Sequence, residues 1–270
     1  MPQARIDELW IYPVKSCRGT PLSSALLGPR GLVGDREWMI VDQRDRFITQ
    51  RTHPQLARIV ATLADDTLTL SADGAAPLTL PRGARDLHGK LRRVQIWRDA
   101  ADAIDAGDEA ARWCGVVLGA SVRLVRASEA TLREPDARWR AGLPAPVNFP
   151  DAFPLLVCNS ASLADLTRRM SAELPMSRFR PNIVISGPAP FAEDHISSLR
   201  AGTVRLRLTK PCTRCSTTAV DQRSGEPGID PLPVLKQFRF NRELLGVTFG
   251  QNAVIESGVG SKLCLGTVEY

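Results

Sequence analysis

The stretch TLTLSADGAAPLTLP, residues 67–81, holds two runs of alternating threonine and leucine on either side of Asp73 and Gly74. Alternation of polar and apolar residues puts every second side chain on one face of a β-strand. An Asp-Gly pair between two such runs is typical of a tight hairpin turn. The stretch therefore predicts two antiparallel strands joined at residues 73–74.

Similar runs occur along most of the chain, so we expect a mainly β protein with a few helices. Gly, Pro and Asp separate the runs at short intervals, which is typical of barrels and sandwiches. The segment 37–51 reads as two strands around a polar turn at residues 42–45. The other strand candidates are 8–16, 91–99, 121–127, 154–160, 182–187, 203–209, 246–257 and 262–270.

Three segments have helical signals. Residues 105–118 have a capping aspartate, acidic residues in the first turn and Gly119 after the last residue. Ser160 or Ser162 can cap a second helix that runs to Leu174, and residues 231–243 hold a third, short one.

A segment with five prolines, residues 133–154, connects two β-rich portions of the chain. We expect an N-terminal β-barrel-like portion over residues 1–121, packed against a second portion over residues 130–270. The connection is either an ordinary loop or a wall over a site between the portions.

Composition excludes several classes of protein. The chain has 270 residues and a net charge of +6, and no apolar run approaches the roughly 18 residues of a membrane span. The N-terminal MPQARIDELW lacks the apolar region of a signal peptide, so we expect a cytoplasmic protein with reduced cysteines. The basic residues form no run and few aromatics accompany them, which argues against nucleic-acid binding.

The motif most suggestive of chemistry is TKPCTRCSTTAVDQRSGE, residues 209–226, with Cys212 and Cys215 in a CxxC arrangement. A structural zinc site needs four ligands, and the chain has no second close cysteine pair; His53, His88 and His195 are isolated. A thioredoxin-like pair should open a helix, whereas β-branched and turn residues follow here. Two packed cysteines, a soft-metal ligand and a sulfur-transfer nucleophile remain open. Lys210 and Arg214 flank the thiols, and positive charge favours a thiolate.

Five motifs in order resemble one family. YPVKSCRG (12–19), GDREWMIVD (34–42), FRPNIVISG (179–187), KPCTRC with TTAVD (210–221) and FGQNAVIESG (249–258) are similar to those of MOSC-domain proteins with an N-terminal β-barrel portion. The mitochondrial amidoxime-reducing component and its bacterial counterparts belong to this family. The resemblance covers nearly the whole chain.

The resemblance implies a molybdenum cofactor, a pterin with a dithiolene and a phosphate, whose metal is ligated by Cys215. Cys212 would then be a packing residue or lie beside the ligand. Matching positions imply that further residues contact the cofactor: Lys15, Ser16, Arg36, Ser160, Arg180, Asn182, Thr213 and Arg214. Four of these are cations, as an anionic cofactor requires.

The implied activity is reduction of N-hydroxylated compounds, such as amidoximes and hydroxylamines, by removal of oxygen at the molybdenum. The chain carries no cysteines for an iron–sulfur domain after its last strand, so electrons would come from a separate protein, ferredoxin-like or cytochrome b5-like with a flavin reductase. Asp221 is a candidate for proton delivery or, more simply, a turn residue. Asn252 stands where some relatives have an aromatic residue. The alternative function is a carrier of molybdenum cofactor, or of sulfur as a persulfide on Cys215.

Overall fold

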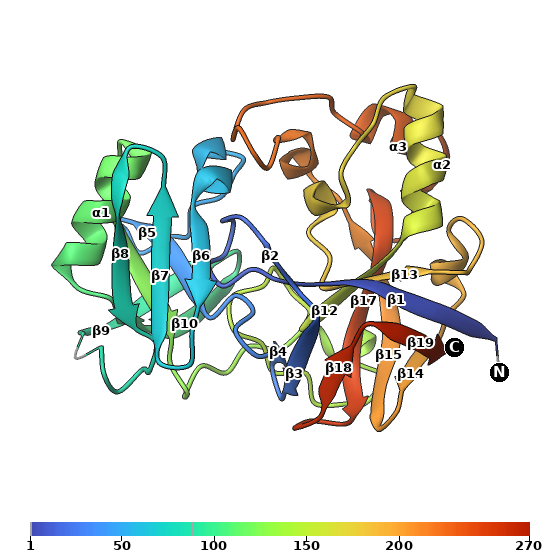
Figure 1. Cartoon of the computed structure of the whole chain (residues 1–270), viewed down its shortest axis with the longest axis horizontal. Coiled ribbons are helices and arrows are strands. Elements are labelled where there is room, and N and C mark those ends of the chain that lie inside the picture. The colour runs from blue at the N-terminus through green and yellow to red at the C-terminus, as the bar shows by residue number, and fades with distance from the viewer. Residues whose placement is uncertain (1, 88) are drawn as a thin grey trace.

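The computed structural model describes residues 2–87 and 89–270. Two β-rich portions lie side by side along the long axis of the molecule, and both termini lie at the far end of the C-terminal portion (Figure 1). Three α-helices occur in the described chain: α1 (Asp108–Leu118), α2 (Ser160–Met170) and α3 (Leu232–Arg239). The predicted fold class, mainly β with a few helices, is confirmed.

The C-terminal portion is built on a closed seven-stranded barrel. In order around the barrel the strands are β12 (Leu155–Asn159), β13 (Ile183–Ser186), β1 (Gln3–Ile11), β19 (Gly266–Glu269), β14 (Ser198–Ala201), β15 (Val204–Thr213) and β17 (Gly246–Ser257). Pairing between β12 and β17 closes the ring. Two short strands extend it: β2 (Thr20–Leu22) pairs with β1, and β16 (Phe240–Asn241) pairs with β17.

The first strand of the chain therefore belongs to the barrel of the C-terminal portion. Ala4, Ile6, Leu9 and Ile11 of β1 are buried in the barrel core. The step from Ile6 to Leu9 breaks the alternation because the register shifts between Ile6 and Glu8, as in a β-bulge. The division at residues 1–121 and 130–270 stays a prediction, and β1 shows that the chain crosses it.

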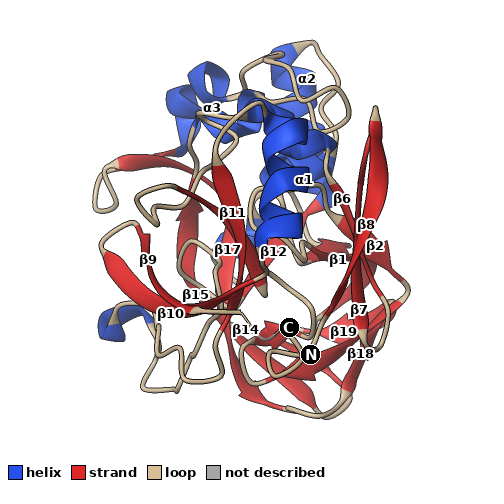
Figure 2. Cartoon of the chain, turned by 90° about the vertical axis from the view of Figure 1, so that its left-hand side faces the viewer, coloured by secondary structure: helices blue, strands red, loops and turns tan. Residues whose placement is uncertain are grey.

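The N-terminal portion has two small sheets. The first contains β5 (Trp38–Asp42), β11 (Val122–Ala127), β10 (Asp99–Asp105) and β9 (Leu91–Ile96); the second contains β6 (Val60–Leu63), β7 (Thr67–Ala72) and β8 (Ala75–Pro81). Both sheets and α1 contribute side chains to one buried cluster, and α1 lies over the strands in Figure 2. The opposite face of the first sheet forms a second cluster with Phe149 of the connecting segment.

The hairpin predicted at residues 67–81 is confirmed: β7 and β8 pair antiparallel, and Gly74 has a φ of 79° in the turn between them. The predicted second strand of 37–51 is reduced to isolated bridges at Arg46 and Phe47. The predicted strand over 262–270 is two strands. Of these, β18 (Lys262–Cys264) pairs with β3 (Ser24–Gly28), which also pairs with β4 (Gly31–Leu32).

Two predicted helix starts are wrong. The first helix begins at Asp108, after Gly107, because Asp105 ends β10 and its carboxylate accepts from Arg92 and Arg123 on the neighbouring strands. The second helix is capped by Asn159, whose side chain accepts from the Ala161 amide.

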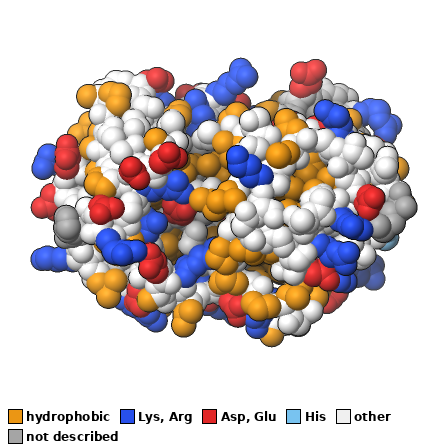
Figure 3. All heavy atoms as spheres, turned by 60° about the horizontal axis from the view of Figure 1, so that its bottom comes forward, with side chains coloured by type: hydrophobic (Ala, Val, Ile, Leu, Met, Phe, Trp, Pro, Cys, Tyr) orange, Lys and Arg blue, Asp and Glu red, His pale blue; other side chains and the backbone are white. Residues whose placement is uncertain are grey.

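On the face seen in Figure 3, Lys and Arg side chains alternate with Asp and Glu side chains, without a large basic area. No helix in the described part of the chain is long and apolar enough to cross a membrane.

Candidate functional site

A cavity of about 200 Å³ lies between the two portions of the chain. Its walls come from loops of the N-terminal portion, the end of the connecting segment and several parts of the barrel portion. The barrel portion contributes the start of β12, the residues before β13, the end of β15 with the residues that follow it, and β17. The residues that carry polar or ionisable side chains into it include Lys15, Ser16, Arg36, Thr49, Arg51, Trp97, Asp151, Arg180, Asn182, Lys210, Cys212, Thr213, Arg214, Cys215, Thr217 and Asn252. Of the two alternatives for 133–154, an ordinary loop or a wall over a site, the lining of the cavity by residues 150–153 favours the wall for that end of the segment.

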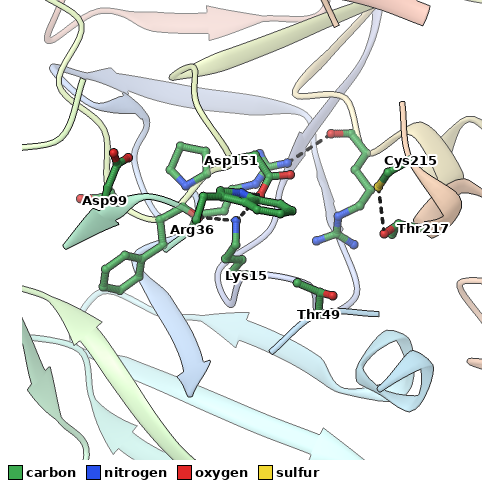
Figure 4. A network of polar contacts seen from close by, with 12 residues as sticks. Lys15, Arg36, Thr49, Asp99, Asp151, Cys215 and Thr217 are labelled. Carbon is green, nitrogen blue, oxygen red and sulfur yellow. Dashed lines mark hydrogen bonds and ion pairs between the residues drawn. The ribbon is translucent and has the colours of Figure 1, made fainter. Parts of the chain in front are cut away.

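Cys215 presents an exposed thiol to this cavity. It follows β15 and precedes the short 3-10 helix Ser216–Ala219. Its Sγ lies 3.3 Å from Thr217 Oγ1. Cys215 and Thr217 lie on one side of the site, and Lys15 and Asp151 lie on the other (Figure 4). A thiol in this position is free to bind a soft metal or to act as a nucleophile.

Cys212 has a different environment. It is half-buried and packs against the apolar cluster that contains Phe179 and Phe249. Arg214 Nη1 donates to its Sγ at 2.9 Å. The two cysteines of the CxxC motif are therefore not equivalent. The resemblance predicts this difference, whereas a dithiol redox pair does not.

Lys15 and Arg36 bring positive charge from the N-terminal portion. Lys15 is 5% exposed and donates to Asp151 Oδ1 at 2.6 Å and to the Phe149 carbonyl at 2.9 Å. Burial lowers the pKa of Lys15, and the charge of Asp151 opposes that shift. Arg36 pairs with Asp35 at 2.6 Å and donates to Asn182 Oδ1 and to the Arg180 carbonyl, both at 3.2 Å.

Arg180 brings charge from the C-terminal portion with unused hydrogen-bonding capacity. Its Nη1 donates to the Cys17 carbonyl at 2.7 Å, while its buried Nη2 has no hydrogen-bond partner in the described chain. The guanidinium groups of Arg36 and Arg180 each lie 4.2 Å from the Tyr12 ring centre. Burial, and then repulsion from Arg36, lowers the pKa of Arg180 to about 10, so it stays charged at neutral pH.

Arg214 also has a free donor. Its Nη2 donates to the Phe179 carbonyl at 2.8 Å, and its buried Nε has no partner in the described residues. Burial alone would lower the pKa of Arg214, but the sulfurs of Cys212, Cys158 and Cys215 raise it above the ordinary value. Among residues 2–87 and 89–270, neither Arg180 nor Arg214 forms an ion pair with a carboxylate, so their charge is available to a ligand.

Cations predominate in the cavity. Asp151 is the one acidic residue among the described residues that line it. Buried donors that lack partners are rare in native proteins, and where they border a cavity they can donate to a bound ion, water or ligand. The arrangement therefore suits an anionic group that accepts from Arg180 and Arg214 and reaches the thiol of Cys215.

The structure brings together eight of the residues implied by the resemblance, namely Lys15, Ser16, Arg36, Arg180, Asn182, Thr213, Arg214 and Cys215. Ser160 does not join them. As the first residue of α2, beyond the capping Asn159, it lines a separate cavity of about 970 Å³ with Trp10 and Met176.

Asp221 also lies outside the cavity. Its carboxylate accepts from the amides of Arg223 and Ser224, which fits the turn role considered for it. Within residues 2–87 and 89–270, no three His, Cys, Asp or Glu side chains gather as ligands of a metal ion. His88 lies outside the described residues.

Sequence reasoning missed several residues of the site. Thr49, Arg51 and Trp97 come from loops and turns that no motif marks, and Asp151 lies in the proline-rich connection. The one signal for Asp151 was its place in the segment considered as a wall. Asn252, noted as a departure from some relatives, pairs with Lys210 across β15 and β17 and lines the cavity.

The chain matches two family descriptions in sequence. Residues 3–121 match the MOSC N-terminal beta barrel domain, and residues 144–266 match the MOSC domain. The chain belongs to the family of MOSC-domain proteins that carry this N-terminal domain.

Among its relatives are the mitochondrial amidoxime-reducing components. The chain is 35% identical to component 2 from Bos taurus over 87% of its own length and 72% of the relative. It is 34% identical to component 1 from Homo sapiens over 93% of its own length and 79% of the relative. It is also 31% identical to the molybdenum cofactor sulfurase of Danio rerio, over 90% of this chain but only 31% of that protein.

Proposed function

We propose that this chain is a molybdenum-cofactor-dependent reductase of N-hydroxylated compounds, with Cys215 as the protein ligand of the metal. The observation that carries the proposal is the exposed thiol of Cys215 in a cavity lined by cations with unpaired donors. Similarity to amidoxime-reducing components over most of the chain supports the choice of substrate.

The residues present fit the cofactor. Arg180 Nη2 and Arg214 Nε are buried donors without an acceptor among the described residues, and the phosphate or pterin oxygens would accept from them. Lys15, Ser16, Arg36 and Thr213 would complete the contacts. Asn182 would act mainly by holding Arg36, since its amide is engaged with Arg36, the Leu156 amide and the Trp10 carbonyl.

When bound, the cofactor supplies the oxygen-atom removal at the metal. The overall reaction of an amidoxime consumes two electrons and two protons and gives an amidine and water. The protein holds the ligand sulfur in place, neutralises the anionic cofactor and shapes the cavity wall with residues 150–153.

The electrons would come from a separate donor protein, ferredoxin-like or cytochrome b5-like. A cytoplasmic location is part of the proposal, and cell fractionation with an antibody against the chain tests it.

The first experiment is to measure molybdenum and pterin in protein purified from a host that makes the cofactor. We expect near-stoichiometric content in the wild type, loss in Cys215→Ala, and a milder effect of Cys212→Ala. The loaded protein should reduce benzamidoxime with a chemical reductant. A wild type without molybdenum, from a host that loads a control molybdoenzyme, would refute the proposal.

A second function, cofactor or sulfur carrier, is favoured by one observation: the exposed thiol of Cys215 in a chain similar to molybdenum cofactor sulfurase. A carrier of cofactor would bind and release it reversibly, and a carrier of sulfur would have one extra sulfur on Cys215, which mass spectrometry would detect. In both cases the protein would show little turnover of N-hydroxylated substrates.

A further inference from the structure

Trp97 occupies a strained position at the edge of the candidate site. It lies in the turn between β9 and β10 with a φ of 55°, a region that bulky side chains rarely adopt. Glycine or asparagine would fit this turn with less strain. The side chain is 43% exposed, so burial in a core does not explain the tryptophan. Strain that persists at such a residue points to a role for its side chain.

Contacts on three sides hold the indole in place. Nε1 donates to Asp151 Oδ1 at 3.0 Å. The Phe47 ring meets the indole edge-on, with 5.0 Å between ring centres, and the Arg51 guanidinium lies 4.4 Å from the indole ring centre. Trp97, Arg51 and Asp151 all line the cavity that contains Cys215. The ring is therefore pre-positioned as part of the cavity wall.

A carboxylate oxygen is available beside the ring. Asp151 Oδ1 accepts from Lys15 and Trp97, whereas Oδ2 has no hydrogen bond or ion pair with the described residues. The Asp151 side chain is 70% exposed. An aromatic surface next to a free carboxylate oxygen suits a planar base that stacks on the ring and donates an N–H to the carboxylate.

We propose that Trp97, together with Asp151, forms the substrate subsite and selects planar N-hydroxylated bases that carry an aromatic ring over small aliphatic ones. This inference rests on the proposed function and specifies its substrate class. Arg51 and Phe47 act as positioning residues for the ring.

The test compares benzamidoxime with acetamidoxime as substrates of the cofactor-loaded protein, with reduced methyl viologen as electron donor. Trp97→Gly removes the ring and accepts the φ of the turn without strain, and Trp97→Phe keeps a ring. We expect Trp97→Gly to lower kcat/KM for benzamidoxime about three- to tenfold, as loss of one aromatic contact predicts. Acetamidoxime should change less than about twofold, and Trp97→Phe should recover most of the loss.

Equal losses on both substrates, or no loss, would overturn the subsite. A lower molybdenum content in Trp97→Gly than in the wild type would also overturn it, because the ring would then contribute to cofactor binding.

Product binding separates this inference from the proposed function. In isothermal titration calorimetry, benzamidine should bind the wild type more tightly than acetamidine, and Trp97→Gly should lose that preference. A binding preference that persists without reduction of either amidoxime would refute the reductase and support the subsite. Equal binding of the two amidines would refute the subsite.

Discussion

Lys15 Nζ lies 2.6 Å from Asp151 Oδ1, although the two residues are 136 positions apart in the sequence. The Lys15 side chain is only 6% exposed. Its ammonium therefore depends on Asp151 and on the Phe149 carbonyl to replace its lost hydration. The pair ties the first loop of the chain to the wall of the cavity.

Asp151→Asn should destabilise the protein because it leaves the buried Lys15 without a counter-charge. We expect a loss of about 1–3 kcal/mol in the free energy of unfolding, below the cost of a fully buried pair because Asp151 is largely exposed. Urea denaturation measures it. The matched control is Asp73→Asn, whose carboxylate is 95% exposed and 3.7 Å from Arg58, and which should change stability by less than about 0.5 kcal/mol. Equal effects of the two substitutions would contradict the role of the pair.

Gln50 and Gln222 should be coupled energetically across the two portions. Each amide nitrogen donates to the other's oxygen, at 3.1 and 2.9 Å, and both side chains are buried. Removing one partner leaves a buried amide without its partner, which costs about 1–3 kcal/mol. A double-mutant cycle of Gln50→Ala and Gln222→Ala should give a coupling energy of about 1 kcal/mol or more. Simple additivity of the two losses would show that the contact contributes nothing.

Glu193 should make stability fall as the pH rises. Its side chain is buried, Oε1 has no partner among the described residues, and Oε2 accepts from Ser162 and Asn159. Burial raises the pKa of Glu193, so the folded state binds a proton that the unfolded state has already lost. The stabilising contribution is complete below the unfolded pKa and disappears as the pH rises through the folded pKa.

Glu193→Gln should remove this part of the pH dependence and be relatively more stable than the wild type at neutral pH. Thermal unfolding from pH 4 to 8 checks it, and parallel profiles of wild type and variant would contradict it.

Arg214→Lys should weaken cofactor retention although it keeps the charge. Lysine cannot reproduce the contacts to the Phe179 carbonyl and Cys212 while presenting the free Nε to a ligand. Loss of one hydrogen bond to a charged group predicts about tenfold weaker binding or more. Molybdenum content after extensive dialysis measures the effect. Arg200→Lys, at an exposed pair with Glu269, serves as the control and should retain the cofactor as the wild type does.

Several motif residues that line the cavity lie next to strands of the barrel. Arg214 and Cys215 come after β15, and Arg180 and Asn182 come before β13. The closed barrel brings the two motifs into contact, and Arg214 donates to the Phe179 carbonyl. Ser160 is not the helix cap, because Asn159 occupies that position, and it lines a different cavity from Cys215. The choice between neighbouring polar residues as a cap depends on backbone angles that a single sequence does not specify.

Other features depend on partners distant in the sequence. Asp105 looks like a helix cap until Arg92 and Arg123 on neighbouring strands are seen to bind it. Trp97 and Asp151 carry no shared motif, and only the fold places the indole beside the carboxylate. A pattern of local spacing cannot reveal such pairs.

The place of β1 between β13 and β19 has a consequence for biosynthesis. During translation, β1 leaves the ribosome before either of its barrel neighbours, and β19 is made long after β13. Until then the hydrogen-bonding edge of β1 that faces β19 is unpaired, and such edges are prone to association between chains. Barrel closure must therefore follow synthesis of β19. A fragment covering only residues 144–266 would lack β1 altogether and leave β13 with an open edge, which makes it a poor candidate for separate expression.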